Sequence, residues 1–402
     1  MMAIQLGAMA EKNTYQTSRI RFEVLDGLRG VAALMVVIFH CFESYCPPGG
    51  QQFINHGYLA VDFFFLLSGF VTGYAYDDRW SRMTVRDFFK RRLVRLHPMV
   101  IAGTVIGACF FFYGGVAYPG IMDIPSWKIA LCIIMGMLLI PCAPCLDIRG
   151  WGDFFPLNCT SWTLVFEYIA NILYALIFRH LPKAALAVLC LCCSFFILDI
   201  TLGWDVFGVF PDGSHYSLFA GWYLTPYDLY TGFSRLMYPF ICGLLISRIL
   251  RERSSSTNPS GSPLRIKNGF LWTAILLIAI FSAPCAGGHD GLANGIFQAM
   301  AVLILFPLIV LAGAGSTVTE KGARICRWLG ELSYPLFIVH YPLMYMQYSF
   351  PRAYPDAPLW IHAAASAGVV VMSVILARCL YKCYDVPVRK WLTDHWLNKH
   401  RP

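Results

Sequence analysis

Residues 27–42 read GLRGVAALMVVIFHCF, an apolar run with an arginine near its start and a histidine near its end. Arg29 and His40 are 11 positions apart, which is almost three whole turns of a helix with about 3.6 residues per turn. Their side chains therefore point the same way, roughly 16 Å apart along the axis. Ionisable groups inside a membrane are costly and normally face a protein interior or a water-filled cavity. The stretch predicts a membrane helix with one polar face.

A second interpretation of this stretch stays open on these residues alone. Arg29 can extend to the lipid headgroups while His40 packs against neighbouring helices, as amphipathic side chains near a membrane surface often do.

The composition of the chain is that of a membrane protein. Hydrophobic residues make up 57% of its 402 positions and charged residues only 13%, whereas soluble domains typically carry about 25% charged residues. The net charge of +8 comes from clusters between apolar segments, and no nucleic-acid-binding motif surrounds them. We expect an all-α integral membrane protein whose partner is the lipid bilayer and not nucleic acid.

Runs of about 20 apolar residues are long enough to cross a bilayer as helices. Ten such segments are predicted, at residues 28–46, 57–76, 94–116, 161–179, 184–203, 231–250, 268–286, 292–313, 332–350 and 361–383. An eleventh run, 127–142, is shorter and ends in a turn rich in proline and cysteine.

The positive-inside rule decides whether the eleventh run crosses. If 127–142 does not cross, all basic clusters lie on one side, whereas a crossing would turn every later basic loop outward. We therefore predict a re-entrant or interfacial segment on the outer side and cytoplasmic termini. The basic clusters are within residues 12–21, 79–92, 179–183, 248–267, 321–327 and 389–401.

The domain organisation is simple. We predict a cytoplasmic N-terminal tail (1–20), a membrane domain (21–390) and a cytoplasmic C-terminal tail (391–402), in the inner (plasma) membrane. Cys142 and Cys145 form a lone C-x-x-C. Without a second pair we predict no metal site, and a disulfide on the outer face is an open alternative.

Two carboxylates are expected near the depth of His40. Asp62 lies one turn into the second predicted helix from its outer end, with Ser68 deeper. Glu167 follows Trp162 at a similar distance below the outer surface. A carboxylate bonded to one imidazole nitrogen would leave the other nitrogen as a general base.

The alternative for both carboxylates is that each pairs with a buried arginine such as Arg235. The residues alone do not decide between a catalytic and a structural role.

Arg92 and Arg95, in FFKRRLVRLHP, are spaced by three and are therefore neighbours on one helical face. Guanidinium groups offer planar, bidentate donors that suit phosphate oxygens. Binding of anionic lipid headgroups would explain the charge of this cluster equally well.

In combination, these segments resemble the acyltransferase-3 family of integral membrane acyltransferases, which acylate carbohydrates. The resemblance covers about residues 21–390. It rests on LDGLRGVAALMVVIFH, GYLAVDFFFLLSGF, FFKRRLVRLHP, SWTLVFEY, LGELSYPLFIVHYP and YDVPVRK, in that order.

The resemblance implies roles for individual residues. His40 matches the histidine regarded as catalytic and Arg29 its partner on the first helix, while Arg92 and Arg95 match paired arginines associated with acyl-CoA. Glu167 matches the glutamate of the Trp-Ser/Thr-Leu element. Tyr334 and His340 match the late Ser-Tyr to His element.

Two departures from the family are visible. The closing element usually carries Glu before its proline, whereas Asp385 precedes Val386 and Pro387 here. Some members also carry an extracytoplasmic hydrolase-like domain, and without one this chain would bind its acceptor itself or rely on separate glycan-assembly proteins.

The resemblance implies a transmembrane O-acyltransferase with no permanently bound cofactor. Acyl-CoA, in the first place acetyl-CoA, is the expected donor, and an extracytoplasmic carbohydrate such as an exopolysaccharide is the expected acceptor. His40 would act as base, oriented by Glu167 or Asp62, with Arg29, Arg92 and Arg95 on the donor phosphates. The alternative is a secondary transporter of a small polar substrate.

Overall fold

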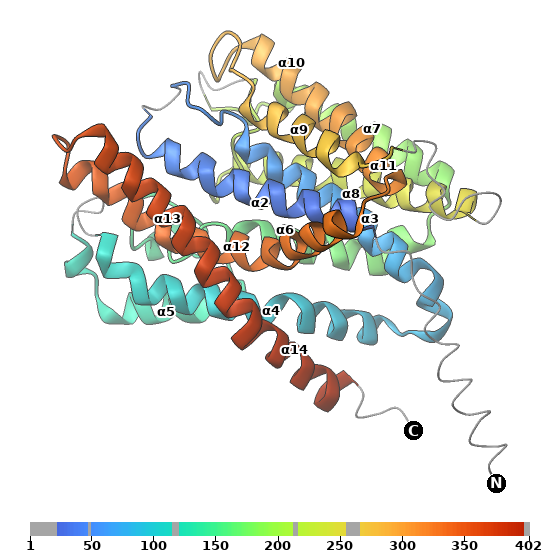
Figure 1. Cartoon of the computed structure of the whole chain (residues 1–402), viewed down its shortest axis with the longest axis horizontal. Coiled ribbons are helices and arrows are strands. Elements are labelled where there is room, and N and C mark those ends of the chain that lie inside the picture. The colour runs from blue at the N-terminus through green and yellow to red at the C-terminus, as the bar shows by residue number, and fades with distance from the viewer. Residues whose placement is uncertain (1–21, 47–49, 115–119, 212–215, 255–265, 398–402) are drawn as a thin grey trace.

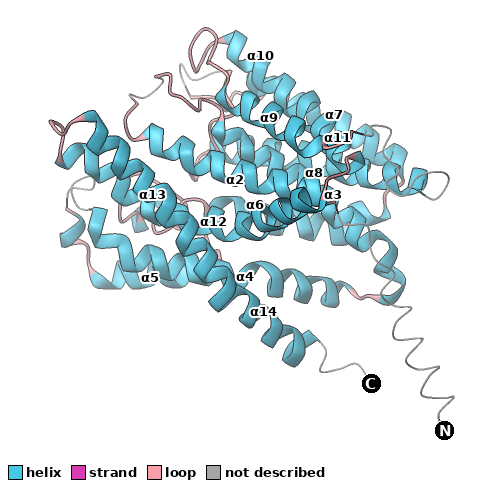
Figure 2. Ribbon diagram, in the orientation of Figure 1, coloured by secondary structure: helices cyan, strands magenta, loops and turns pink. Residues whose placement is uncertain are grey.

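The computed structural model describes residues 22–46, 50–114, 120–211, 216–254 and 266–397, and its regular structure is helical (Figures 1 and 2). Two isolated β-bridges are the only strand-like pairings in these residues. The α-helices are α2 (Glu23–Glu43), α3 (Ala60–Tyr76), α4 (Val85–Phe110), α5 (Ser126–Leu138), α6 (Ser161–Leu176), α7 (Lys183–Thr201), α8 (Pro226–Ser254), α9 (Gly269–Ser282), α10 (Leu292–Met300), α11 (Phe306–Gly315), α12 (Glu320–Ala353), α13 (Leu359–Leu380) and α14 (Val386–Leu392).

In the described residues, eight stretches are long and apolar enough to cross a membrane. They coincide with eight of the ten predicted segments. The other two predicted segments also contain helices, but α9 has only 14 residues, and α12 is a 34-residue helix with three internal prolines and a more polar sequence. The fold is therefore that of an all-α, multi-pass membrane protein.

The run at 127–142 contains α5, a helix of 13 residues that ends where Leu139 adopts a left-handed conformation with φ 55°. At about 1.5 Å per residue this helix is roughly 20 Å long, shorter than the roughly 30 Å hydrocarbon core of a bilayer. Its length agrees with the prediction that this run does not cross. Figure 1 shows α5 lying beside α4, with which it is in contact.

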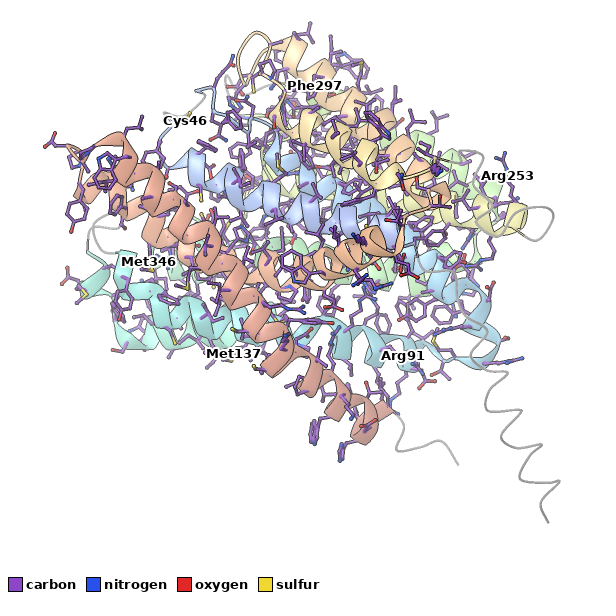
Figure 3. The ribbon with its side chains drawn as sticks, viewed as in Figure 1. Cys46, Arg91, Met137, Arg253, Phe297 and Met346 are labelled. Atoms are coloured by element: carbon purple, nitrogen blue, oxygen red, sulfur yellow. The ribbon has the colours of Figure 1, made fainter. Side chains whose placement is uncertain are left out.

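Both described ends of the chain lie at the same end of the bundle. Phe22 contacts Tyr74 near the end of α3, and Lys90 near the start of α4 lies over the ring of Trp396. Arg91 and Arg253 are at the opposite end of the helices from Cys46 and Met346 (Figure 3).

The two predicted terminal tails can be compared with the structure only in part. Residues 1–20, the predicted N-terminal tail, lie outside the described residues. The predicted start of the C-terminal tail, residue 391, falls within helical structure, because α14 runs to Leu392 and a further helical turn spans Thr393–Leu397. No break separates residues 390 and 391.

The C-x-x-C pair is not brought together as a disulfide, since all 15 cysteines are free. The Cys142 sulfur lies 3.9 Å from the Cys132 sulfur, while Cys145 is exposed.

Close helix approaches through glycine set the positions of the polar residues. A Cβ on Gly30 would lie 2.5 Å from the backbone oxygen of Leu329, so α2 and α12 touch beside Arg29. A Cβ on Gly69 would lie 2.0 Å from the backbone oxygen of Phe240, so α3 and α8 touch in the same way. Small residues let backbones approach closely at helix interfaces in membranes.

A buried ion pair joins α3 to α8. Arg235 and Asp62 are both 0% exposed, and the Arg235 Nη2 lies 2.7 Å from the Asp62 Oδ2. Arg235 also donates to the backbone oxygens of Ala220 (2.9 Å) and Tyr58 (2.7 Å). The guanidinium therefore ties two helices and two connecting segments together.

We expect Asp62→Asn to destabilise the protein by about 3–5 kcal/mol, because it leaves the Arg235 cation buried without its counter-ion. Thermal unfolding of the detergent-solubilised chain measures this loss. The matched control is Glu252→Gln, which breaks the exposed pair with Lys183 and should cost less than about 1 kcal/mol. Equal losses in both variants would contradict a special role for the buried pair.

Candidate functional site

Two cavities enter the helical bundle from its two ends. The arginine cavity, about 180 Å³, is lined by residues that include Arg29, Arg92 and Arg95. The histidine cavity, about 620 Å³, is lined by residues that include His40 and many aromatic side chains. Both cavities share the wall residues Val61, Thr163 and Phe337, where they meet. The single polar face predicted for α2 thus lines two cavities, one at each end.

His40 lies in the wall of the histidine cavity and is held by a residue of its own helix. Its Nδ1 is 2.7 Å from the Glu43 Oε2, and the same oxygen accepts a hydrogen bond of 2.6 Å from the Tyr348 hydroxyl. The fully buried ring of His340 stacks on His40 with centroids 5.6 Å apart. With Nδ1 engaged, Nε2 of His40 is the nitrogen available for chemistry.

The prediction that Glu167 or Asp62 contacts His40 is wrong. Asp62 is engaged by Arg235, and Glu167 lies in the wall of the arginine cavity. The carboxylate on His40 is Glu43, three positions along the same helix, a spacing that places both side chains on one face.

Glu167 lies deeper than predicted because α6 starts inside the protein. The Asn158 side chain, 2% exposed, donates to the Ile338 oxygen at 2.9 Å, so the segment before α6 is already buried in the bundle. Glu167 accepts a hydrogen bond of 2.6 Å from the Ser68 hydroxyl and pairs with Arg92. These residues form one polar cluster in the arginine cavity.

The arginines of this cavity differ in how much they are engaged. Arg29 donates to the Ser333 hydroxyl (2.8 Å) and the Gly330 oxygen (3.0 Å), which anchors it to α12. Arg92 is 3% exposed and paired with Glu167, whereas Arg95 is exposed and makes no ion pair with the described residues. Arg95 is therefore the cation most available to an incoming anion.

The C-terminal helix contributes to the arginine cavity. Asp385 is buried, lines the cavity and pairs with Arg389 at 3.0 Å. Tyr334 lines the cavity too and donates its hydroxyl to the Leu96 oxygen at 2.7 Å. The closing YDVPVRK element thus lies beside the predicted arginines.

The remaining predicted residue, Trp162, lies in the wall of the histidine cavity. Its ring is 5.7 Å from the Arg235 guanidinium, so it packs against the buried ion pair and faces the cavity.

The cavity residues that sequence reasoning missed include Glu43, Tyr348, Asp153 and Arg389. The three-residue spacing of His40 and Glu43 was the only local signal among them. The other three come from a loop, α12 and α14, and no spacing in the sequence relates them to His40 or Arg95.

Comparisons with known proteins agree with this arrangement. The family model described as an acyltransferase domain matches residues 22–378. The chain is 23% identical to the putative peptidoglycan O-acetyltransferase YrhL of Bacillus subtilis, over 91% of this chain and 54% of the relative. It is 22% identical to the peptidoglycan O-acetyltransferase OatA of Listeria monocytogenes, over 94% of this chain and 57% of the relative.

The chain therefore spans a little over half the length of these two relatives. A third relative, "Protein 2 in picA locus" of Rhizobium radiobacter, is 34% identical over 39% of this chain and 81% of its own length. No solved structure matches the chain. Since the family model covers most of its length, the chain belongs to the acyltransferase-3 family of membrane acyltransferases.

Proposed function

We propose that this protein transfers an acyl group, in the first place acetyl, from cytoplasmic acyl-CoA to a hydroxyl of a carbohydrate on the outer side of the plasma membrane. One observation carries the proposal: an arginine-lined cavity and a histidine-lined cavity open at opposite ends of the bundle and meet at three shared wall residues. Donor and acceptor can thus approach one reaction point from opposite sides. The names of the O-acetyltransferase relatives support the reaction type.

The arginine cavity suits the donor. Phosphate oxygens of acyl-CoA would bind Arg95 first, with Arg29 and Arg389 within the same wall. Arg92, paired with Glu167, would orient the cluster more than it binds the nucleotide. The pantetheine arm would then pass Val61, Thr163 and Phe337 to bring the thioester to the histidine cavity.

His40 and Glu43 suit the transfer step. Nε2 of His40 would take the proton of an acceptor hydroxyl as its oxygen attacks the thioester carbonyl. The carbon–sulfur bond then breaks, and the imidazolium returns the proton to the leaving thiolate of CoA. Glu43 on Nδ1 holds the ring in the required tautomer and stabilises the imidazolium.

His40→Ala should abolish transfer, because it removes the base. The measurement uses the purified chain in proteoliposomes with radiolabelled acetyl-CoA on the arginine side, and mass spectrometry of surface glycans from cells that carry each variant. Unchanged glycan acylation in the variant would overturn the proposal. Movement of a solute across the membrane without consumption of acetyl-CoA would point to the transporter alternative.

Glu43→Gln should lower turnover by about 10²-fold with little change in the KM for acetyl-CoA, because the amide does not stabilise the imidazolium. Tyr348→Phe is the matched control, since it removes the other hydrogen bond to the same carboxylate oxygen and leaves the charge. Steady-state kinetics of both variants give the result. A variant of Glu43 with wild-type turnover would exclude this role.

Arg95→Ala should raise the KM for acetyl-CoA by about tenfold or more, the expected effect of losing a charged hydrogen bond. Arg91→Ala, four positions away and outside the cavity wall, should change it less than about twofold. The comparison separates a phosphate contact from a general effect of positive charge on the membrane surface. A general effect would raise the KM for acetyl-CoA by the same factor in both variants.

A further inference from the structure

Asp153 is a buried carboxylate in the wall of the histidine cavity whose Oδ2 has no hydrogen-bond partner. The residue is only 4% exposed, so bulk water does not solvate this oxygen well. Buried polar groups are almost always hydrogen-bonded, and an exception in a cavity wall calls for an explanation. A ligand that donates a hydrogen bond from inside the cavity would supply the missing partner.

The segment that carries Asp153 is held in place before any ligand arrives. The Asp147 side chain accepts from the backbone nitrogens of Arg149 (2.9 Å), Gly150 (3.0 Å) and Gly152 (2.7 Å). Gly150 and Gly152 have φ of 76° and 77°, a conformation that glycine adopts without strain.

The residue after Asp153 is bonded on both sides. The Phe154 nitrogen donates to the Trp222 oxygen at 3.0 Å, and its oxygen accepts from the Cys142 nitrogen at 2.8 Å. Asp153 itself forms an isolated bridge with Tyr223. The carboxylate that carries the unpartnered Oδ2 therefore belongs to a constrained segment and not to a freely moving loop.

Aromatic side chains line the same cavity as this carboxylate, among them Trp151, Phe219, Trp222, Tyr223 and Tyr227. The cavity volume of about 620 Å³ lies within the range of pockets for small molecules. Flat apolar rings beside a hydrogen-bond acceptor suit a ring with apolar C–H faces and hydroxyl groups at its edge. A sugar ring has this character.

The charges of the wall favour an uncharged ring. Glu43, Asp153 and Asp290 contribute carboxylates to the cavity. The cation of Arg235 is already neutralised by Asp62, and Arg352 is the other guanidinium of the wall. A sugar carrying its own carboxylate would place a second anion against Asp153.

We infer that Asp153 binds a hydroxyl of the acceptor and that this acceptor is an uncharged polyhydroxylated ring. The inference rests on the proposed function, because it assigns the acceptor side of the same reaction. A hydroxyl held by Asp153 would fix the ring in the cavity and present a second hydroxyl to His40, which lines the same cavity. Asp153 is then a residue that sets acceptor binding and specificity.

The ionisation of Asp153 gives this assignment a pH signature. Burial, together with the charges of Asp147 and Glu43, raises its pKa to about 7, while Arg149 and a hydrogen bond with the Cys159 thiol act in the opposite direction. Tyr223 and Tyr341 are further titratable neighbours of Asp153. Below pH 7 the carboxyl is protonated and accepts hydrogen bonds poorly, so the acceptor KM should fall as pH rises through about 7.

The test compares Asp153→Asn with Asp356→Asn in the full chain reconstituted in nanodiscs. Asp356 is exposed and lies outside the walls of both cavities. The probes are methyl glycosides of glucose, galactose, mannose and N-acetylglucosamine, with methyl glucuronoside as the charged counterpart. Sugar binding is measured by thermal shift, and transfer by the label that the sugar acquires from radiolabelled acetyl-CoA.

We expect Asp153→Asn to lower kcat/KM for the best neutral sugar by about tenfold or more, with its KM for acetyl-CoA within twofold of wild type. Its acceptor KM should lose the change near pH 7, and Asp356→Asn should behave like wild type. The charged glycoside should be the poorest acceptor.

Acceptor kinetics of Asp153→Asn within twofold of wild type would overturn the inference, as would a wild type that binds no neutral glycoside. Failure of the proposed function looks different, because the wild type would then consume no acetyl-CoA. In that case the thermal shifts still decide the inference: loss of sugar binding in Asp153→Asn alone supports it. Retained acetyl-CoA binding shows that the variant is folded.

Discussion

Charge buried inside a membrane protein has to be matched inside the protein, and the Asp62–Arg235 pair is the clearest case here. Both side chains are inaccessible, and the arginine also satisfies two backbone oxygens from segments outside its own helix. Because an isolated charge at this depth is costly, the pair holds α3 and α8 in one register. That register places Val61 and Ser68 of α3 in the walls of the cavities.

The same requirement separates the two halves of the candidate site. At one end Glu167 pairs with Arg92 and accepts a hydrogen bond from Ser68. At the other end Glu43 is hydrogen-bonded to His40 and Tyr348. Each cavity therefore holds its own carboxylate. Between them lie an aliphatic, a hydroxyl-bearing and an aromatic side chain, Val61, Thr163 and Phe337, with no ionisable group. These three side chains form a wall common to both cavities, and in the proposed function the acyl chain would pass them.

The two cavities also differ in what they can recognise. The arginine cavity is the smaller of the two and is lined by four arginines, whereas the histidine cavity is larger and mainly aromatic, with two arginines in its wall. In the proposed function this asymmetry suits a nucleotide-bearing donor on one side and a neutral polyhydroxyl acceptor on the other. Arg29 and His40 of the same helix would then serve different partners.

The sequence by itself determined the membrane class, the polar face of the first helix and the order of the family motifs, because hydrophobic length and helical period are local properties. It also predicted several polar residues of the two cavities, including Arg95, Ser68 and Tyr334 in one and His40 in the other. The sequence could not determine which side chains contact one another in the folded protein. Glu167 was assigned the wrong depth because the start of α6 is buried by contacts with α12, about 180 residues away in sequence. Tyr348, Asp153 and Arg389 reach the cavities only through packing of distant segments, and tertiary structure alone decides which buried charge meets which counter-charge.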